Sequence, residues 1–219
     1  MIGGYFVFIW PNIENFEISD AHGSELNRLW QEEYSRDFRF SDNWEKGSFN
    51  CLSQESGMVQ GLHLLAKTNF HTPDDVEQID FYKWVQNLDL EFDVRPMLRL
   101  AGRSEFATRH VFMNSIVLAE NNPVEIANII IHEARHIEEG FNSHVVCIKD
   151  TERLCDQRLE ADPSTGGAYN YNVLFLHHIR QYSDASAQNK RRAKKLMQEI
   201  FDGRFNSVNP DDRTKYGLD

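Results

Sequence analysis

Apolar positions recur with two different spacings along the chain, and the change between them predicts the order of the elements. Short continuous or alternating apolar runs predict strands, and these lie in the first half of the chain. Spacings of three and four residues predict helices, which dominate after residue 120. The expected strands are 5–10, 92–100 and 110–119; the expected helices are 24–38, 58–67, 74–88, 123–139, 166–183 and 184–202. A few strands followed by several helices favour an α+β fold.

The chain shows no internal repeat, no low-complexity tract and no linker rich in proline and glycine. Its 219 residues suffice for one sizeable core. We therefore expect a single domain over residues 1–219, with a small N-terminal mixed sheet covered by helices and a helical C-terminal part.

The helix expected over residues 123–139 has clear signals at both ends. Asn122 can cap it, Pro123 suits the first turn, and Glu125 stands three residues after the cap, as in a capping box. Gly140 follows the last regular residue, where a left-handed conformation is often needed. One face of this helix is a core stripe of Ile126, Ile130, Ala134 and Ile137.

The opposite side of the same helix carries the pattern His132-Glu133-Ala134-Arg135-His136. His132 and His136 lie about 40° apart, so both imidazoles can point at one ion. Glu133 flanks the pair, about 60° round from His136, and is placed to take a proton from water at the metal. Buried paired histidines without a ligand would be costly, which favours a metal site over a structural pair.

The HExxH pattern on a helix resembles that of the zincin metallopeptidases, and the strand-like HVFMNSIVLAE before it is similar to their edge strand, which pairs with an extended substrate. The resemblance covers residues 109–170. It implies a zincin-like α+β fold, Zn²⁺ bound by His132 and His136, Glu133 as general base, and a peptide or protein as substrate.

The third metal ligand is left open by the sequence. In HEARHIEEGFNSH, Gly140 comes one residue later and His144 two residues later than in the HExxHxxGxxH pattern of metzincins, but His144 can still return to the metal. Glu160 lies at a distance that suits the glutamate ligand of gluzincins, and Asp156 would suit an aspartate ligand. His144 is the preferred ligand, with Asp156 and Glu160 as alternatives.

These residues together predict a zinc-dependent hydrolase, specifically a metallopeptidase in which Glu133 is the general base. The alternative is a non-catalytic binding module stabilised by metal, in which four protein ligands would close the site. A glutamate beside the first histidine would have no role there, which favours catalysis. The segment Asn50-Cys51-Leu52-Ser53 partly matches a metal-binding segment of peptide deformylases, but it lacks the glycine and the glutamate of that segment.

Other polar and aromatic residues near the pattern have less specific interpretations. Tyr169 and Tyr171 begin the helix that follows, and either could donate a hydroxyl to an oxyanion or simply pack. His177 and His178 cannot both face one metal from adjacent helical positions, so we expect them to be surface or core residues.

The net charge of the chain limits the kinds of partner it can bind, and its cysteines bear on the compartment in which it occurs. The net charge of −11 argues against a general nucleic-acid or anionic-membrane binder, and we interpret the basic group Lys190, Arg191, Arg192, Lys194 and Lys195 as a solvated helix face. No apolar run is long enough for a membrane span. No signal peptide is recognisable, so the protein is expected in the cytoplasm or exported with its leader removed. Cys147 and Cys155 bracket a polar loop, and they could form a disulfide in an oxidising compartment or stay reduced in the cytosol.

Overall fold

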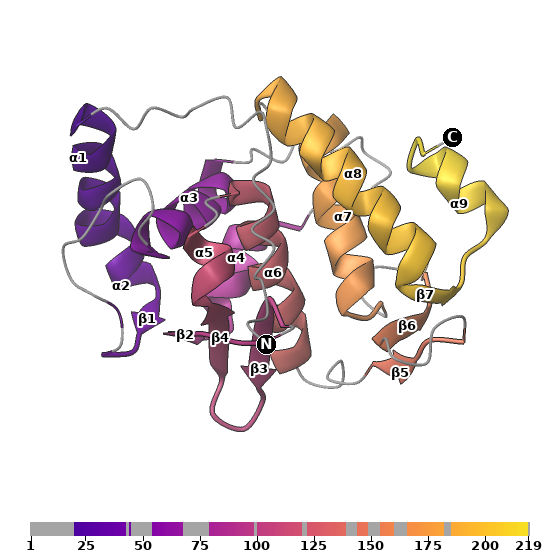
Figure 1. Cartoon of the computed structure of the whole chain (residues 1–219), viewed down its shortest axis with the longest axis horizontal. Coiled ribbons are helices and arrows are strands. Elements are labelled where there is room, and N and C mark those ends of the chain that lie inside the picture. The colour runs from indigo at the N-terminus through magenta and orange to yellow at the C-terminus, as the bar shows by residue number, and fades with distance from the viewer. Residues whose placement is uncertain are drawn as a thin grey trace, which may run out of the picture.

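The computed structural model describes residues 20–42, 44, 54–67, 79–98, 100–119, 122–138, 144–148, 154–159, 166–181 and 185–218. The expected strand over residues 5–10 and the Cys51 segment lie outside these ranges. The described part has an α+β fold with two small mixed sheets, one in each half of the chain (Figure 1).

The N-terminal sheet has the strand order β1-β2-β4-β3. Its strands are β1 (Arg39–Phe40), β2 (Glu91–Arg95), β3 (Gly102–Glu105) and β4 (His110–Asn114). Strand β2 runs parallel to both β1 and β4, whereas β3 runs antiparallel to β4, with Ser104 opposite Val111. Strand β2 ends before Pro96, which lacks the N–H that a sheet ladder needs.

Two expectations about the strand at residues 110–119 are wrong. The strand ends at Asn114, and α5 (Ser115–Ala119) follows it. The amide of Asn114 bonds the backbone at Met97, Leu100 and Ile116, and these bonds hold the turn from strand to helix. Strand β4 also lies inside the sheet, between β2 and β3, so it is not an edge strand; the edge is formed by β3, which we did not predict.

Helices cover this sheet much as the apolar spacing predicts. The segment expected as a helix over 24–38 contains α1 (Asp20–Leu29), a π-helical turn (Trp30–Tyr34) and α2 (Ser35–Asp37). Helix α3 (Gln54–Lys67) contains the expected 58–67. Helix α4 (Phe81–Asn87) is shorter than the expected 74–88; the Asp80 side chain caps it, and residues 74–78 lie outside the described ranges.

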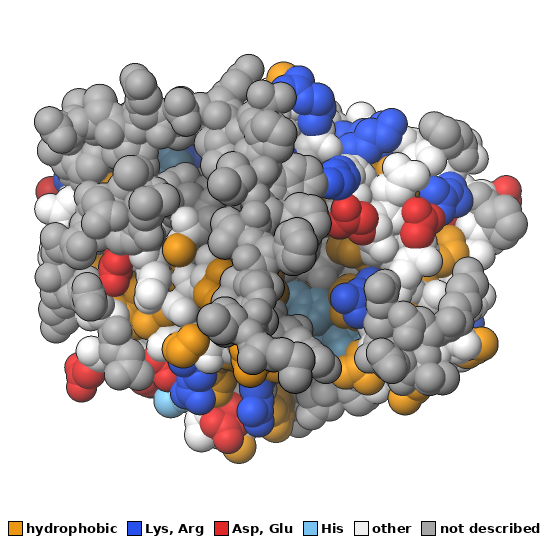
Figure 2. Space-filling view, viewed as in Figure 1, with side chains coloured by type: hydrophobic (Ala, Val, Ile, Leu, Met, Phe, Trp, Pro, Cys, Tyr) orange, Lys and Arg blue, Asp and Glu red, His pale blue; other side chains and the backbone are white. Residues whose placement is uncertain are grey.

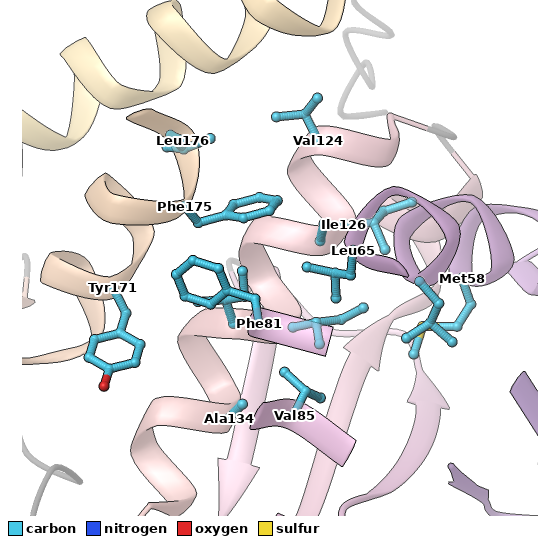
Figure 3. Packing of buried hydrophobic residues seen from close by; sticks show 14 of the residues in the cluster. Met58, Leu65, Phe81, Val85, Val124, Ile126, Ala134, Tyr171, Phe175 and Leu176 are labelled. Atoms are coloured by element: carbon cyan, nitrogen blue, oxygen red, sulfur yellow. The ribbon is translucent and has the colours of Figure 1, made fainter. Parts of the chain in front are cut away.

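Helix α6 (Pro123–Ile137) occupies the centre of the molecule and packs against α3, α7 and β3 (Figure 1). The side chain of Asn122 accepts bonds from the N–H groups of Val124 and Glu125, which confirms the expected cap. Gly61 of α3 permits the close approach of the two helices, because a Cβ there would lie 2.5 Å from Cγ2 of Ile126. Figure 3 shows the resulting core, where residues of α3, α4 and α7 meet α6.

The C-terminal half contains α7 (Ala168–Gln181), α8 (Ala187–Gly203) and α9 (Pro210–Lys215). The first two agree with the helices expected over 166–183 and 184–202. This half also contains a small sheet that was not predicted. Its strands lie in the order β5 (Val145–Val146), β6 (Leu154–Arg158) and β7 (Phe205–Ser207). A disulfide between Cys147 and Cys155 links β5 to β6, as one of the two expectations had it. None of the helices in the described ranges is long and apolar enough to cross a bilayer.

Candidate metal centre

Three histidines from two elements converge on one point. His132 and His136 project from α6, and His144 immediately precedes β5. Their Nε2 atoms lie 3.2 Å apart for His132 and His136, 3.0 Å for His136 and His144, and 3.1 Å for His132 and His144. Nitrogens that bind one tetrahedral zinc ion are about 3.3 Å apart, so this triangle has the size of a metal site. The three histidines could hold a metal ion.

The outer ring nitrogens show which tautomer two of these histidines adopt. Nδ1 of His132 lies 2.8 Å from Oδ1 of Asn172, whose amide nitrogen donates to the backbone oxygen of Asn128 and so fixes the amide orientation. Nδ1 of His144 lies 3.0 Å from Oδ1 of Asp156. Both outer nitrogens therefore carry the hydrogen and donate it. The Nε2 atoms of these two rings are left with lone pairs that face the centre of the triangle.

Lone pairs that face each other at this distance need a positive centre between them. A proton on His132 is disfavoured, because burial and the adjacent His136 and His144 lower its pKa well below the usual 6.5. A metal cation can accept the inward lone pairs, and imidazole nitrogens are ligands that Zn²⁺ and related ions prefer. The donor set thus fits a metal ion, although it does not identify which one.

Asp156, one of the alternatives for the third ligand, lies behind His144 rather than in the triangle. Its Oδ1 accepts from His144, and its Oδ2 accepts from the backbone N–H of Asn170 in the first turn of α7, at 3.1 Å. A carboxylate is favourable at the N-terminus of a helix. Gly167 lies close to the same carboxylate: a Cβ at this position would be only 2.5 Å from Oδ2 of Asp156. The other alternative, Glu160, lies outside the described residues.

Glu133 is buried between α6 and the edge strand β3, and it is not part of the histidine triangle. Its Oε2 accepts a bond of 2.8 Å from the hydroxyl of Ser104. Gly102 leaves room for the carboxylate, because a Cβ at that position would come within 3.0 Å of Oε1. Burial raises the pKa of Glu133 to about 7, against the opposing effect of the Ser104 bonds.

The two tyrosines named by the sequence have different surroundings. The ring of Tyr169 stacks on His144, with centroids 4.7 Å apart, and lies 4.6 Å from the ring of His132. Tyr171 is buried beneath the guanidinium of Arg135, whose Cζ is 3.9 Å from the ring centroid. Tyr169 therefore covers the metal centre, whereas Tyr171 packs in the core.

Arg135, within the HExxH pattern, forms hydrogen bonds to the segment that leads into α7. It is 2% exposed, and its Nε and Nη2 donate to the carbonyl of Gly166 at 3.0 and 2.7 Å. It also pairs with Glu138. This role of Arg135 was not predicted from the sequence, although a charged residue on an apolar helix face is a signal of a buried partner.

His177 and His178 are not part of the triangle, as expected for surface or core residues. His178 is buried in the core, and the ring of His177 meets the edge of the Tyr216 ring with centroids 5.0 Å apart. Of the basic group on α8, Arg192 pairs with Glu125 of α6, and Lys195 with Glu199.

The space-filling view shows a hollow in one face of the molecule (Figure 2). In Figure 2 histidine side chains are visible in a hollow near the middle of this face, with a basic side chain beside them. No family model, curated protein or solved structure matches the chain. The functional interpretation therefore rests on the three-histidine cluster.

Proposed function

We propose that the protein is a zinc-dependent hydrolase, specifically a metallopeptidase that resembles the zincins. The observation that carries this proposal is the triangle of Nε2 atoms from His132, His136 and His144. The Nδ1 atoms of His132 and His144 also form hydrogen bonds with side-chain oxygens of the protein. Outer contacts of this kind orient ligating imidazoles in metal sites. A buried carboxylate, Glu133, follows the first of these histidines in the chain.

His132, His136 and His144 would hold the ion. When bound there, zinc supplies Lewis acidity, which lowers the pKa of a water molecule and polarises a peptide carbonyl. Glu133 acts as the general base: it takes a proton from water and passes it to the leaving amine. Ser104 keeps the carboxylate in one orientation.

The edge strand β3 supports a peptide as the substrate. It pairs with β4 on one side, and within the described part of the chain no strand pairs with its other side. Ser104, which contacts Glu133, belongs to this strand. An extended peptide can add to an exposed strand edge through main-chain hydrogen bonds, and here such a peptide would run beside the general base.

The competing function is a binding module in which the metal is only structural. Structural zinc is closed by four protein ligands, whereas catalytic zinc keeps one position for water or substrate. The described residues bring three ligands together, which supports the catalytic function.

The experiment is metal analysis and peptide hydrolysis by the wild-type protein and two variants. Glu133→Gln should keep one metal ion per chain and lose hydrolysis by about 10²–10⁴-fold, because the base is removed but the ligands remain. His132→Ala should lose both the metal and the activity. His110→Ala is the matched control and should lose neither, since His110 lies on β4 and pairs with Glu91.

Each variant can contradict one part of the proposal. An active Glu133→Gln enzyme would exclude Glu133 as the base. A His132→Ala protein that still binds stoichiometric metal would exclude this histidine as a ligand. Metal-loaded wild-type protein that cleaves no member of a broad peptide mixture would favour the binding module.

A further inference from the structure

Arg204 lies next to the metal centre and has not been assigned a role so far. It follows α8 directly, and its N–H bonds the carbonyl of Ile200. Its own carbonyl accepts from the N–H of Asp156 at 3.0 Å, at the start of the pairing between β6 and β7. Two backbone bonds therefore fix Arg204 beside the aspartate that holds His144.

The side chain of Arg204 extends over the aromatic cover of the centre. Its Cζ is 5.2 Å from the centroid of the Tyr169 ring, which stacks on His144 and lies against His132. A guanidinium above an aromatic ring is held by a cation–π interaction that leaves its N–H edge open to other partners. Its hydrogen bond to the carbonyl of Leu154 is long, at 3.4 Å.

The guanidinium of Arg204 donates to a backbone carbonyl and not to a carboxylate of the described residues. By contrast, Arg192 pairs with Glu125, and Arg213 pairs with Asp202. No ion pair to Arg204 is formed within the ranges that the structure describes. In a chain with 34 acidic and 23 basic residues, an arginine without a carboxylate partner next to a metal centre is a specific feature.

We propose that Arg204 binds a carboxylate of the substrate, so that the enzyme prefers peptides with a negative charge close to the cleaved bond. This inference rests on the proposed function. Arginine binds carboxylates through two parallel N–H···O bonds, which orient the ligand as well as attract it. The carboxylate is either the C-terminus of a peptide or the side chain of Asp or Glu; both present the same group to the guanidinium.

The first test measures binding without catalysis. The protein is loaded with Co²⁺, and acetate and succinate are titrated while the visible absorption of the metal is followed. Acetate offers one carboxylate, which the metal can take, whereas succinate offers a second one for Arg204. We expect the wild-type protein to bind succinate at least about 10-fold more tightly than acetate, as for a charge-assisted bond of about 1.5 kcal/mol.

Three variants assign that preference to the side chain. Arg204→Met should reduce the ratio of succinate to acetate affinity to near one, and Arg204→Lys should keep part of it. Arg191→Met is the matched control, because Arg191 is exposed on α8 and carries the same charge; it should keep the wild-type ratio. An equal affinity for both acids in the wild-type protein, or an unchanged ratio in Arg204→Met, would overturn the inference.

The second test distinguishes the two sources of the carboxylate. Hydrolysis is compared for a neutral peptide with a free C-terminus, the same peptide with an amidated C-terminus, and an amidated peptide that contains Asp. Preference for the first identifies a C-terminal carboxylate, and preference for the third a side chain; either preference should disappear in Arg204→Met through a higher KM. Equal cleavage of all three would contradict the inference but not the metal centre, which fails only if the wild-type protein binds no Co²⁺.

Discussion

Asp156 determines the position of the third histidine through both of its oxygens. One oxygen accepts from His144, and the other accepts from the backbone of Asn170, so the carboxylate is fixed between the metal centre and the start of α7. The carboxylate also makes Nδ1 the protonated nitrogen of His144, which leaves the opposite nitrogen with its lone pair.

Replacement of Asp156 by asparagine should therefore weaken metal binding without removing a ligand. We expect the zinc dissociation constant of Asp156→Asn to rise by about 10–100-fold, the usual effect of losing an outer carboxylate. Competition with a chromophoric chelator measures this change. Asp211→Asn, on the exposed first turn of α9, is the control and should bind zinc like the wild type. Unchanged affinity in Asp156→Asn would mean that the carboxylate does not support the ligand.

The residues of the centre differ in how far the sequence reveals them. His132 and His136 share one capped helix, so their relative position follows from helix geometry alone. The position of His144 depends on how the chain returns after that helix, and the sequence could only rank it above Asp156 and Glu160. Asn172 is 40 residues from His132 and meets it only because α7 packs on α6. No local pattern could predict that contact.

At the scale of elements, the long helices and the apolar strands β2 and β4 were predictable, whereas β3 and the small C-terminal sheet were not. Helices such as α6 and α8 present an apolar stripe over several turns, which the spacing of the residues shows directly. Strand β3 has the sequence GRSE, without apolar alternation, because an edge strand covers little of the core. The apolar run Ser115–Ala119 forms a helix because the side chain of Asn114 ends the preceding strand.

The contact between α7 and the C-terminal α9 predicts a specific pH dependence. His177 meets Tyr216, and Arg180 donates to the Tyr216 carbonyl, so both residues hold the end of the chain on α7. Burial, followed by the charges of Arg180 and Lys215, lowers the pKa of His177 to about 4. Between pH 6.5 and 4 the unfolded chain thus binds a proton that the folded chain does not, and stability falls as the pH falls through this range.

His177→Asn should reduce that loss of stability. Because the ring is partly exposed, we expect its contribution to the drop in unfolding free energy from pH 7 to pH 4 to be about 1–2 kcal/mol. Urea unfolding at several pH values measures it, with His110→Asn as a control at a site outside the α7–α9 contact. A variant with the same pH profile as the wild type would show that His177 does not titrate in this way.

At the scale of the whole molecule, the metal centre connects the two halves of the chain. Helix α6 carries two of the three histidines and packs in the core with the N-terminal sheet, whereas His144 immediately precedes β5 of the C-terminal sheet. An ion bound by all three histidines would be a cross-link between these parts, and its binding energy would add to the stability of the fold.

Zinc should therefore raise the melting temperature of the protein. At a free zinc concentration about 1,000 times the dissociation constant, the gain is about 4 kcal/mol, which corresponds to about 8–16 °C for a chain of this length. Calorimetry with zinc and then with excess chelator measures the shift and its reversal. His144→Ala should show a small fraction of it, because the cross-link is lost. A full shift in this variant would exclude His144 as a ligand.

The close approach of Gly167 to Asp156 limits how this chain can diverge during evolution. A side chain at 167 would displace the carboxylate, so the two positions should be conserved or replaced together. Homologues that keep the centre should therefore keep the order of its residues. In this chain seven residues separate the HExxH pattern from His144, eleven separate His144 from Asp156, and ten separate Asp156 from Gly167. A homologue that retains the aspartate but carries a bulky residue in place of the glycine would be incompatible with this packing.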